Sequence, residues 1–252
     1  MLPLVLCYHA VSSAWPCSLA MPEEAFARQI GYLHRHGYAG LTVSEAERRR
    51  VAGTLPRKTV VVTFDDAFAS TLRAKPILDG VGYPGTVFVV TSFAESNALL
   101  EWPGIEQWRS GPYADELASL DWAALGQLAS DGWEIGSHTV THPRLPALDD
   151  QELARELGDS RHEVLARVGH CDTIAYPYGA ADRRVADAAA AAGYRNGLTL
   201  TSSHQRDEPL LRPRTGLYPS DRWRERIKLS PWFGAVRRSR LGGRLVEAAA
   251  RQ

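Results

Sequence analysis

The sequence predicts one α/β domain in which a parallel sheet is covered by helices. Short apolar runs recur along the chain without the polar alternation of half-exposed strands, as expected for strands that are buried on both faces. Amphipathic stretches separate these runs, which is the order of strand–helix units. The 252 residues, 44% of them hydrophobic and 23% charged, suit one large core. Roughly six or seven such units either close as a barrel or stay open as a doubly wound sheet, and periodicity alone does not choose.

Strands and helices are expected to alternate along most of the chain. The expected strands cover residues 4–8, 59–64, 86–91, 133–137, 173–177, 197–200 and 210–218. Helices are expected over 22–37, 68–79, 121–131, 149–168 and 180–192, and "TVSE" at 42–45 has the spacing of a capping box. The stretch 92–120 is long for a loop and carries Trp102, Trp108 and Tyr113. It is either a substrate-facing insertion or a satellite core.

The composition limits the classes of function. The 29 basic side chains balance the 29 acidic ones, which argues against a protein built mainly to bind nucleic acid. Three cysteines without CxxC spacing predict neither a disulfide framework nor a cysteine zinc site, and they fit a reducing compartment. The first apolar run looks like a core strand rather than a signal peptide, and no run approaches the roughly 18 apolar residues of a membrane helix. We therefore expect a cytoplasmic protein.

Two adjacent carboxylates, Asp65 and Asp66, follow directly after the expected strand at 59–64. Active groups of parallel α/β folds gather at the carboxyl ends of the strands, so this position is a candidate site. Neighbouring carboxylates at a buried strand end repel each other unless a cation or a proton relieves them. One interpretation gives one carboxylate to a metal and leaves the other as a base; the alternative is an N-cap pair at the start of a helix.

Two histidines, His138 and His142, stand four positions apart after the expected strand at 133–137. Alone they are as well explained by packing or by chance. Together with one of the aspartates they make a three-ligand site with an open position, the arrangement that catalytic zinc uses.

A turn built from Pro177, Tyr178 and Gly179 follows the expected strand at 173–177. Proline fixes the backbone locally, so the Tyr178 amide could point into the site as an oxyanion donor. The same sequence is also an ordinary strand-to-helix turn. His9, at the end of the first strand, is a candidate wall residue of the site, although a core histidine fits equally well.

The segments "TFDD", "SHTVTH" and "YPYG" resemble, in this order, the first three motifs of the polysaccharide deacetylases, which form carbohydrate esterase family four. The resemblance runs from about residue 4 to 218. It implies a distorted (β/α) barrel with about seven parallel strands in a single catalytic domain over 1–220. It also implies hydrolysis of an N-acetyl or O-acetyl group on a sugar, glycan or lipid-linked saccharide.

The resemblance also implies a role for each motif residue. Asp66, His138 and His142 would bind a divalent metal, most readily Zn²⁺, with Co²⁺, Ni²⁺ and Fe²⁺ served by the same ligands. Asp65 would be the general base, and the Tyr178 amide would stabilise the oxyanion next to Pro177.

The sequence departs from the family pattern at three places. Ala67 follows the aspartates where the family has glycine, a change that should leave the metal site intact. Ala175 stands where the family has an arginine that orients the base. Arg214 or Arg212 is the candidate replacement, because a late strand would bring it to the same end of the barrel. Arg214 is also counted among the substrate-binding residues. The late motif that supplies a general acid has no clear match. His204 is the candidate for that acid.

The C-terminal residues 221–252 are expected to form a basic extension on or beside the barrel. From residue 222 onward, nine lysines and arginines face two glutamates, with Trp223, Trp232 and Phe233 among them. This composition suits peripheral contact with an anionic membrane at the inner face of the membrane, whereas the alternative is a closing helix with solvated arginines.

Two other functions stay open at this point. A glycan-binding protein without catalytic activity could keep the same fold, because the family arginine is missing and the acid is unassigned. A metal amidohydrolase acting on a C–N bond of a small non-sugar substrate is the second. The oligomeric state is not predicted.

Overall fold

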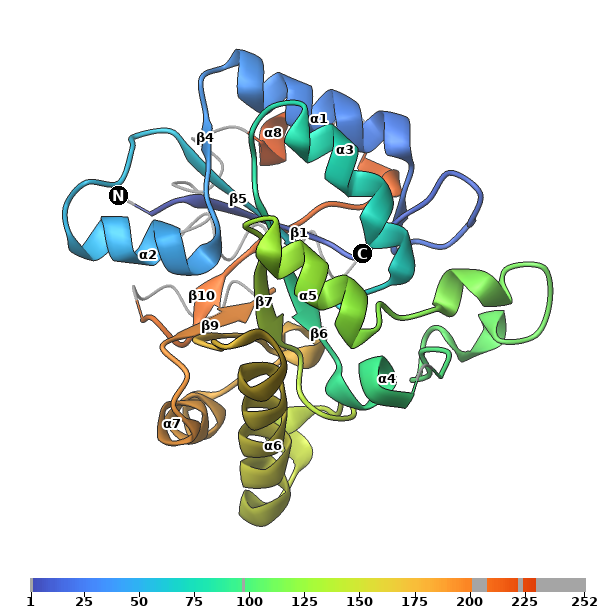
Figure 1. The fold of residues 1–252 in the computed structure, drawn as a ribbon, viewed down its shortest axis with the longest axis vertical. Coiled ribbons are helices and arrows are strands. Elements are labelled where there is room, and N and C mark those ends of the chain that lie inside the picture. The colour runs from blue at the N-terminus through green and yellow to red at the C-terminus, as the bar shows by residue number, and fades with distance from the viewer. Residues whose placement is uncertain (1, 97, 201–207, 222–223, 230–252) are drawn as a thin grey trace.

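The structure is a computed structural model that describes residues 2–96, 98–200, 208–221 and 224–229. A parallel sheet forms its centre, in the order β10-β9-β8-β7-β6-β5-β1-β11 (Figure 1). Its strands are β1 (Leu4–Tyr8), β5 (Thr59–Phe64), β6 (Gly85–Val89), β7 (Glu134–Ser137), β8 (Thr173–Ala175), β9 (Asn196–Thr199), β10 (Arg212–Pro213) and β11 (Thr215–Gly216). The short β4 (Ala39–Gly40) pairs with β5, while β2 (Ala10–Val11) and β3 (Ala20–Met21) pair with each other.

The sheet closes on itself at β10 and β11. These two strands are separated by Arg214 alone; β10 pairs with β9, and β11 pairs with β1. The backbone N–H of Arg214 donates to the carbonyl of Thr199 at 2.8 Å, and that of Leu217 donates to the carbonyl of Cys7 at 3.0 Å. The segment therefore bridges the two edges of the sheet. The predicted distorted barrel of parallel strands is confirmed, and the open doubly wound sheet is excluded. In place of one strand over 210–218 there are two strands of two residues each.

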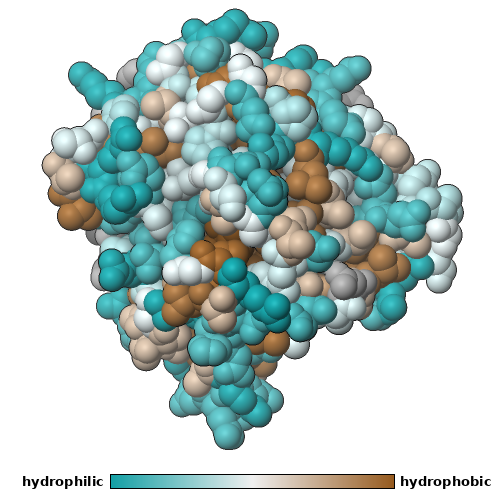
Figure 2. Space-filling view, viewed as in Figure 1, coloured by the Kyte–Doolittle hydropathy of each residue, from teal (hydrophilic) through white to brown (hydrophobic). Residues whose placement is uncertain are grey.

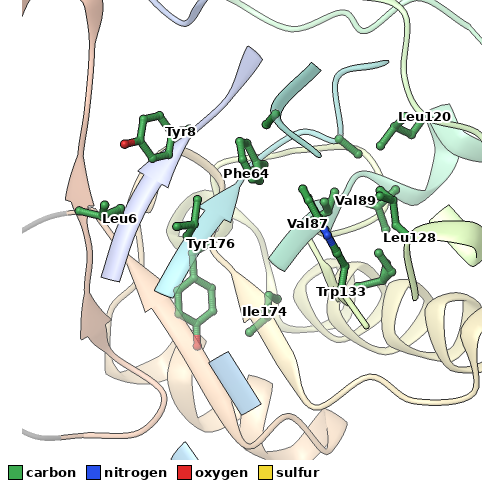
Figure 3. Close-up of a cluster of buried hydrophobic side chains, with 14 of the residues drawn as sticks. Leu6, Tyr8, Phe64, Val87, Val89, Leu120, Leu128, Trp133, Ile174 and Tyr176 are labelled. Carbon is green, nitrogen blue, oxygen red and sulfur yellow. The ribbon is translucent and has the colours of Figure 1, made fainter. Parts of the chain in front are cut away.

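The outward faces of the strands pack against a ring of helices. The apolar side chains between strands and helices form the main core, which includes Leu6, Phe64, Val87 and Ile174 (Figure 3). The helices are α1 (Glu23–Arg35), α3 (Lys75–Asp79), α5 (Trp122–Ser130), α6 (Asp150–Val168) and α7 (Arg183–Ala192), with the short 3₁₀ turns η1 (Ala69–Ala74) and η5 (Pro177–Gly179) between elements. Helices α1, α5, α6 and α7 lie close to their predicted ranges, because a hydrophobic stripe facing the strands fixes where each can begin and end. The helix predicted over 68–79 is instead the 3₁₀ turn η1 followed by the short α3.

Local capping explains where α6 begins and ends. Asp149 and Glu152 form a complete capping box at the start of α6, and Gly169 ends that helix in the left-handed conformation. The box predicted at "TVSE" forms only by half. Thr42 accepts from the Glu45 N–H at the start of α2 (Val43–Val51), but the Glu45 side chain pairs with arginines of the same helix.

The inner faces of the strands hold a second apolar layer below the candidate site. Val61, Phe88 and Leu198 pack there with Val43 and Ala46 of α2. The first turn of α2 is tied to the amino ends of β6 and β7: the Val43 N–H donates to Thr86, and Ser44 donates to the buried carboxylate of Glu134. Helix α2 therefore closes the end of the barrel opposite to the ends where β5 and β7 deliver Asp65 and His138.

The stretch 92–120 forms the satellite core that was one of the two alternatives, and part of it also lines a cleft. It holds the end of α4 (Thr91–Ser96) and the turns η2 (Glu106–Trp108) and η3 (Ala114–Leu117), and it projects from the barrel on the right of Figure 1. Trp102, Trp108 and Tyr113 pack with Trp15 and neighbours in a cluster separate from the main core. Trp102 also lines the cleft described below. We call this cluster the satellite core.

The surface carries few exposed large apolar side chains. Among the described residues these are Val51, Leu72, Leu165 and Ile227, and the face drawn in Figure 2 is mostly hydrophilic. No helix in the described ranges is long and apolar enough to cross a membrane. Of the predicted basic extension, α8 (Arg224–Lys228) and Leu229 are described; Leu229 joins the main core, and Lys228 donates to the Gly216 carbonyl at 2.9 Å. Trp223, Trp232 and Phe233 lie outside the described residues.

Substitution of Gly136 tests the packing beneath the site. A Cβ on this β7 residue would lie 2.5 Å from Thr173 Oγ1 and 2.6 Å from the Phe88 ring. Gly136→Ala should therefore lower the free energy of unfolding by about 1–3 kcal/mol, measured by urea denaturation. The matched control is Gly126→Ala in α5, where a Cβ meets nothing within 4 Å. It should raise stability by about 0.5–1 kcal/mol. Equal effects of the two substitutions would contradict the packing that we describe.

Candidate active site

Three loops at the carboxyl ends of β5, β7 and β8 build the candidate site, and their backbones are strained. The non-glycine residues with positive φ, within the ranges that the structure describes, are Asp66 (69°), Ala67 (54°), Thr139 (70°), His142 (64°) and Tyr178 (58°). All of them lie in these loops. Such conformations cost about 1–3 kcal/mol each and persist only where the surrounding structure enforces them, most often at functional sites. The strain at Ala67 also explains why glycine suits this position.

Asp66, His138 and His142 converge on one point. The Nε2 atoms of His138 and His142 lie 3.3 and 3.4 Å from Asp66 Oδ1, and the three side chains are buried. Asp66 Oδ1 has no hydrogen-bond donor among the described residues. A buried carboxylate oxygen with two imidazole nitrogens around it is left without compensation unless a cation or a proton lies between them. These donors fit a divalent metal that accepts nitrogen and oxygen ligands.

The two imidazoles differ in their surroundings. His138 Nδ1 lies 2.7 Å from the Ala175 carbonyl, so Nδ1 carries a proton, and in the neutral ring Nε2 keeps a lone pair that a metal can accept. Burial alone would lower the pKa of His138, but the charges of Asp65 and Asp66 outweigh it and raise the pKa. Burial lowers the pKa of His142 to about 3, and Asp66 opposes this shift only in part. His142 is therefore a neutral imidazole at physiological pH, the form that binds metals.

Asp65 is held by Arg214. The guanidinium donates from Nη1 to Oδ1 at 2.6 Å and from Nη2 to Oδ2 at 2.7 Å, and both side chains are buried. Nη1 also donates to Thr63 Oγ1 at 3.0 Å. Burial alone would raise the pKa of the Asp65 carboxyl, but Arg214 outweighs it and holds the pKa well below its usual range. Asp65 is therefore ionised whenever the barrel is folded at neutral pH.

A second group of potential ligands, Cys7, His9 and Asp65, lies beside the first. The Cys7 thiol is 3.4 Å from Asp65 Oδ2, and burial raises its pKa, which keeps the sulfur protonated. Both oxygens of Asp65 already accept from Arg214. Because the arginine supplies the positive charge that Asp65 needs, this second group is a poor metal site.

A cleft of about 220 Å³ opens over the two aspartates. Polar groups lie at its floor, with His9, His138 and His142 beside the carboxylates, whereas Leu19, Trp102, Ile105 and Leu200 give it apolar walls. Tyr178 lines it as well. The turn that carries Tyr178 is fixed by the N–H of Gly179, which donates to the Tyr176 carbonyl at 2.8 Å. Gly179 is required here, because its φ is +65° and a Cβ would lie 2.4 Å from the Leu200 nitrogen.

The structure brings most of the predicted site residues together. Asp65, Asp66, His138, His142, Tyr178 and His9 all line the cleft. Arg214 lies behind Asp65 rather than on the cleft wall, and Arg212 pairs with Glu47 instead of with Asp65. Pro177 is buried in the turn before Tyr178 and is not among the lining residues. His204 lies outside the described residues.

Several cleft residues were not singled out from the sequence. Leu19 belongs to the loop between β2 and β3, and Trp102 and Ile105 belong to the projecting stretch. Trp102 was noted as an aromatic of an insertion, but its ring stacks on His142 with 4.2 Å between the centroids. Neither loop has a periodic pattern that would place it at a strand end, so the sequence offers no local signal for these contacts.

The chain belongs to the polysaccharide deacetylase family. The family model described as polysaccharide deacetylase matches residues 52–197. YxkH of Bacillus subtilis (strain 168), a protein named for the same family, is 30% identical over 200 residues, which cover 77% of this chain and 63% of YxkH. The chain thus spans less than two thirds of that relative.

Solved structures share the fold. The deacetylase PplD of Streptococcus pyogenes, solved in complex with acetate, superimposes with a TM-score of 0.76 at 23% identity, covering 92% of this chain and 99% of PplD. The BpsB deacetylase domain of Bordetella bronchiseptica gives a TM-score of 0.66 at 25% identity, covering 86% of this chain and 95% of that domain.

Removal of the Arg214 guanidinium should expose the cost of burying Asp65. In Arg214→Met the carboxylate keeps its burial and loses its partner, so the free energy of unfolding should fall by about 3–5 kcal/mol, measured by chemical denaturation at pH 7. Asp65→Asn placed in the same protein removes the unpaired charge and should restore part of this stability. A double variant no more stable than Arg214→Met would show that the charge is not the cause.

Proposed function

We propose that this protein is a metal-dependent hydrolase that removes an acetyl group from an N-acetylated or O-acetylated sugar, glycan or lipid-linked saccharide. The observation that carries the proposal is the convergence of Asp66, His138 and His142 beside an ionised Asp65 on the floor of one cleft. Membership of the polysaccharide deacetylase family supports it, as does the similarity to PplD, whose solved structure holds acetate.

Asp66 Oδ1 and the two Nε2 atoms would hold the metal. A divalent ion bound there, most readily Zn²⁺, supplies Lewis-acid activation of a water molecule and of the acetyl carbonyl. The protein contributes a buried site with neutral imidazole at His142 and a fixed tautomer at His138. The surrounding structure that enforces the strained backbone at Asp66 and His142 would hold these two ligands in place before the metal binds.

Asp65 would act as the general base. It lines the cleft next to Asp66, and Arg214 fixes the orientation of its carboxylate. It would take a proton from the attacking water while the acetyl carbonyl gains negative charge. The backbone N–H of Tyr178 would donate to that oxygen. Loss of one such donor typically costs about 3–4 kcal/mol in the activation barrier.

His9 would act as the general acid. Its ring lines the same cleft from the end of β1, beside the aspartate pair rather than among the three proposed ligands. The ring stacks against Tyr218, with 6.4 Å between the ring centroids. From this position it would donate a proton to the nitrogen or oxygen that leaves the acetyl group. We assign the acid to His9 because its ring lines the cleft beside Asp65; His204, the candidate from the sequence, lies outside the described residues.

An acetate-release screen tests the proposed function. The metal-loaded protein should release acetate from at least one compound in a panel of N-acetylated and O-acetylated glycans and lipid-linked sugars. A chelator should abolish the release and added Zn²⁺ should restore it. Asp65→Asn should keep one ion per chain and lose about 100-fold or more in kcat, whereas His138→Ala should lose the ion and the activity together. If the metal-loaded protein releases no acetate from any compound, the proposal is wrong.

The role of His9 has a separate test based on the leaving group. His9→Gln should lower kcat on an N-acetylated sugar by about 100-fold, because an amine must be protonated as it leaves. With 4-nitrophenyl acetate, whose leaving group needs no proton, kcat should change by less than about threefold. Metal content is the control and should stay at the wild-type value. Equal losses on both substrates would contradict the assignment.

A further inference from the structure

We infer that Trp102 is a positioning residue for the proposed metal ligand His142. Its indole fixes the orientation of the His142 ring, as a hydrogen bond does for the ring of His138. The inference rests on the proposed function only in assuming that Asp66, His138 and His142 hold a metal. The Trp102 and His142 rings lie nearly parallel, with 4.2 Å between their centroids and an angle of 29° between their planes.

The two histidines are oriented by different means. A metal-binding histidine almost always donates its second ring N–H to a carbonyl, a carboxylate or water, which fixes the ring. His138 follows this rule through the Ala175 carbonyl at 2.7 Å. His142 does not, since its Nδ1 is buried and has no hydrogen-bond partner within the described ranges. Its backbone N–H donates to Thr139 Oγ1, but that bond leaves the ring free to rotate about χ1 and χ2.

Aromatic rings take the place of the missing hydrogen bond. Trp102 covers one side of the His142 imidazole, and Tyr178 also contacts it, with 4.7 Å between the centroids and planes at 58°. Contacts of this kind restrict ring rotation through packing and through the quadrupoles of the rings. Because the Trp102 ring is the nearer and the more parallel of the two, its loss would open space beside the imidazole.

The satellite core holds Trp102 rigidly against His142. Trp102 is 7% exposed, and its ring meets the Phe93 ring edge to face, with 5.7 Å between the centroids. The Ile105 N–H donates to the Trp102 carbonyl at 3.2 Å, and the neighbouring Leu100 N–H donates to the Leu117 carbonyl at 2.8 Å. The projecting stretch is thus fastened at both sides of Trp102, so the position of the indole is set by the fold and not by the metal.

Metal affinity separates this role from a purely structural one. We would measure the Kd for Zn²⁺ by competition with a chromophoric chelator in wild type and three variants. Trp102→Leu should weaken binding by about 10-fold or more, the range found when residues that orient metal ligands are removed. Trp102→Phe keeps an aromatic face and should stay within about threefold of wild type. Trp108→Leu is the matched control, since Trp108 packs on Trp15 and Tyr113 in the same cluster.

The control variant should bind Zn²⁺ like wild type even if it is less stable. Thermal unfolding of the metal-free proteins shows whether the two leucine variants lose similar stability. The d–d absorption of the Co²⁺-loaded protein should change in Trp102→Leu and not in Trp108→Leu, because only the former alters the ligand geometry.

Three outcomes overturn the inference, and they are distinguishable. If Trp102→Leu binds Zn²⁺ as tightly as wild type, Trp102 does not position His142, while the proposed metal site stands. If Trp108→Leu weakens binding as much as Trp102→Leu, the effect belongs to the satellite core as a whole and not to the stack. If wild type binds no Zn²⁺, the proposed metal site fails and the inference fails with it.

Discussion

Arg214 and Asp65 form a buried ion pair that joins the seam of the barrel to the floor of the cleft. The backbone of Arg214 bonds to β9 at the point where β10 gives way to β11, and its guanidinium reaches Asp65 at the end of β5. The same residue therefore takes part in closing the barrel and in orienting the Asp65 carboxylate. Without the strand pairing there would be no buried cation at this place, and without the cation Asp65 would be a costly uncompensated charge.

The ion pair also explains how two adjacent carboxylates share a buried strand end. Repulsion between Asp65 and Asp66 is relieved on the Asp65 side by Arg214, whereas on the Asp66 side the proposed metal would supply the positive charge. Asp65 has the permanent charge of Arg214, and Asp66 faces the nitrogens of His138 and His142. An arginine keeps its partner ionised but makes it a weaker base. A weak base can take a proton from a water molecule only if that water has been made more acidic. The proposed metal would do this, so the ion pair and the metal would act together.

Much of this arrangement was predictable because its signals lie in short, continuous stretches of the sequence. Parallel strands buried on both faces leave apolar runs, and Asp65, Asp66, His138 and His142 stand directly after two of them. The barrel seam was harder, since β10 and β11 have two residues each and no pattern of their own. Arg214 was a candidate, but its pairing with a residue 149 positions away depends on closure of the sheet. The contact between Trp102 and His142 was not predicted, because stacking between two loops leaves no periodic pattern in the sequence.

The strained loops and the rigid barrel depend on each other. Left-handed backbone at Asp66, His142 and Tyr178 raises the energy of the folded state locally, and short loops alone would relax out of it. They cannot relax here because each loop follows directly from a paired strand of the barrel, and aromatic packing also holds His142 and Tyr178. The packing of the large core offsets the strain of these loops, so their side chains are in position before any ligand binds. Preorganisation of this kind is what a site needs if its donors are to act without rearranging during the reaction.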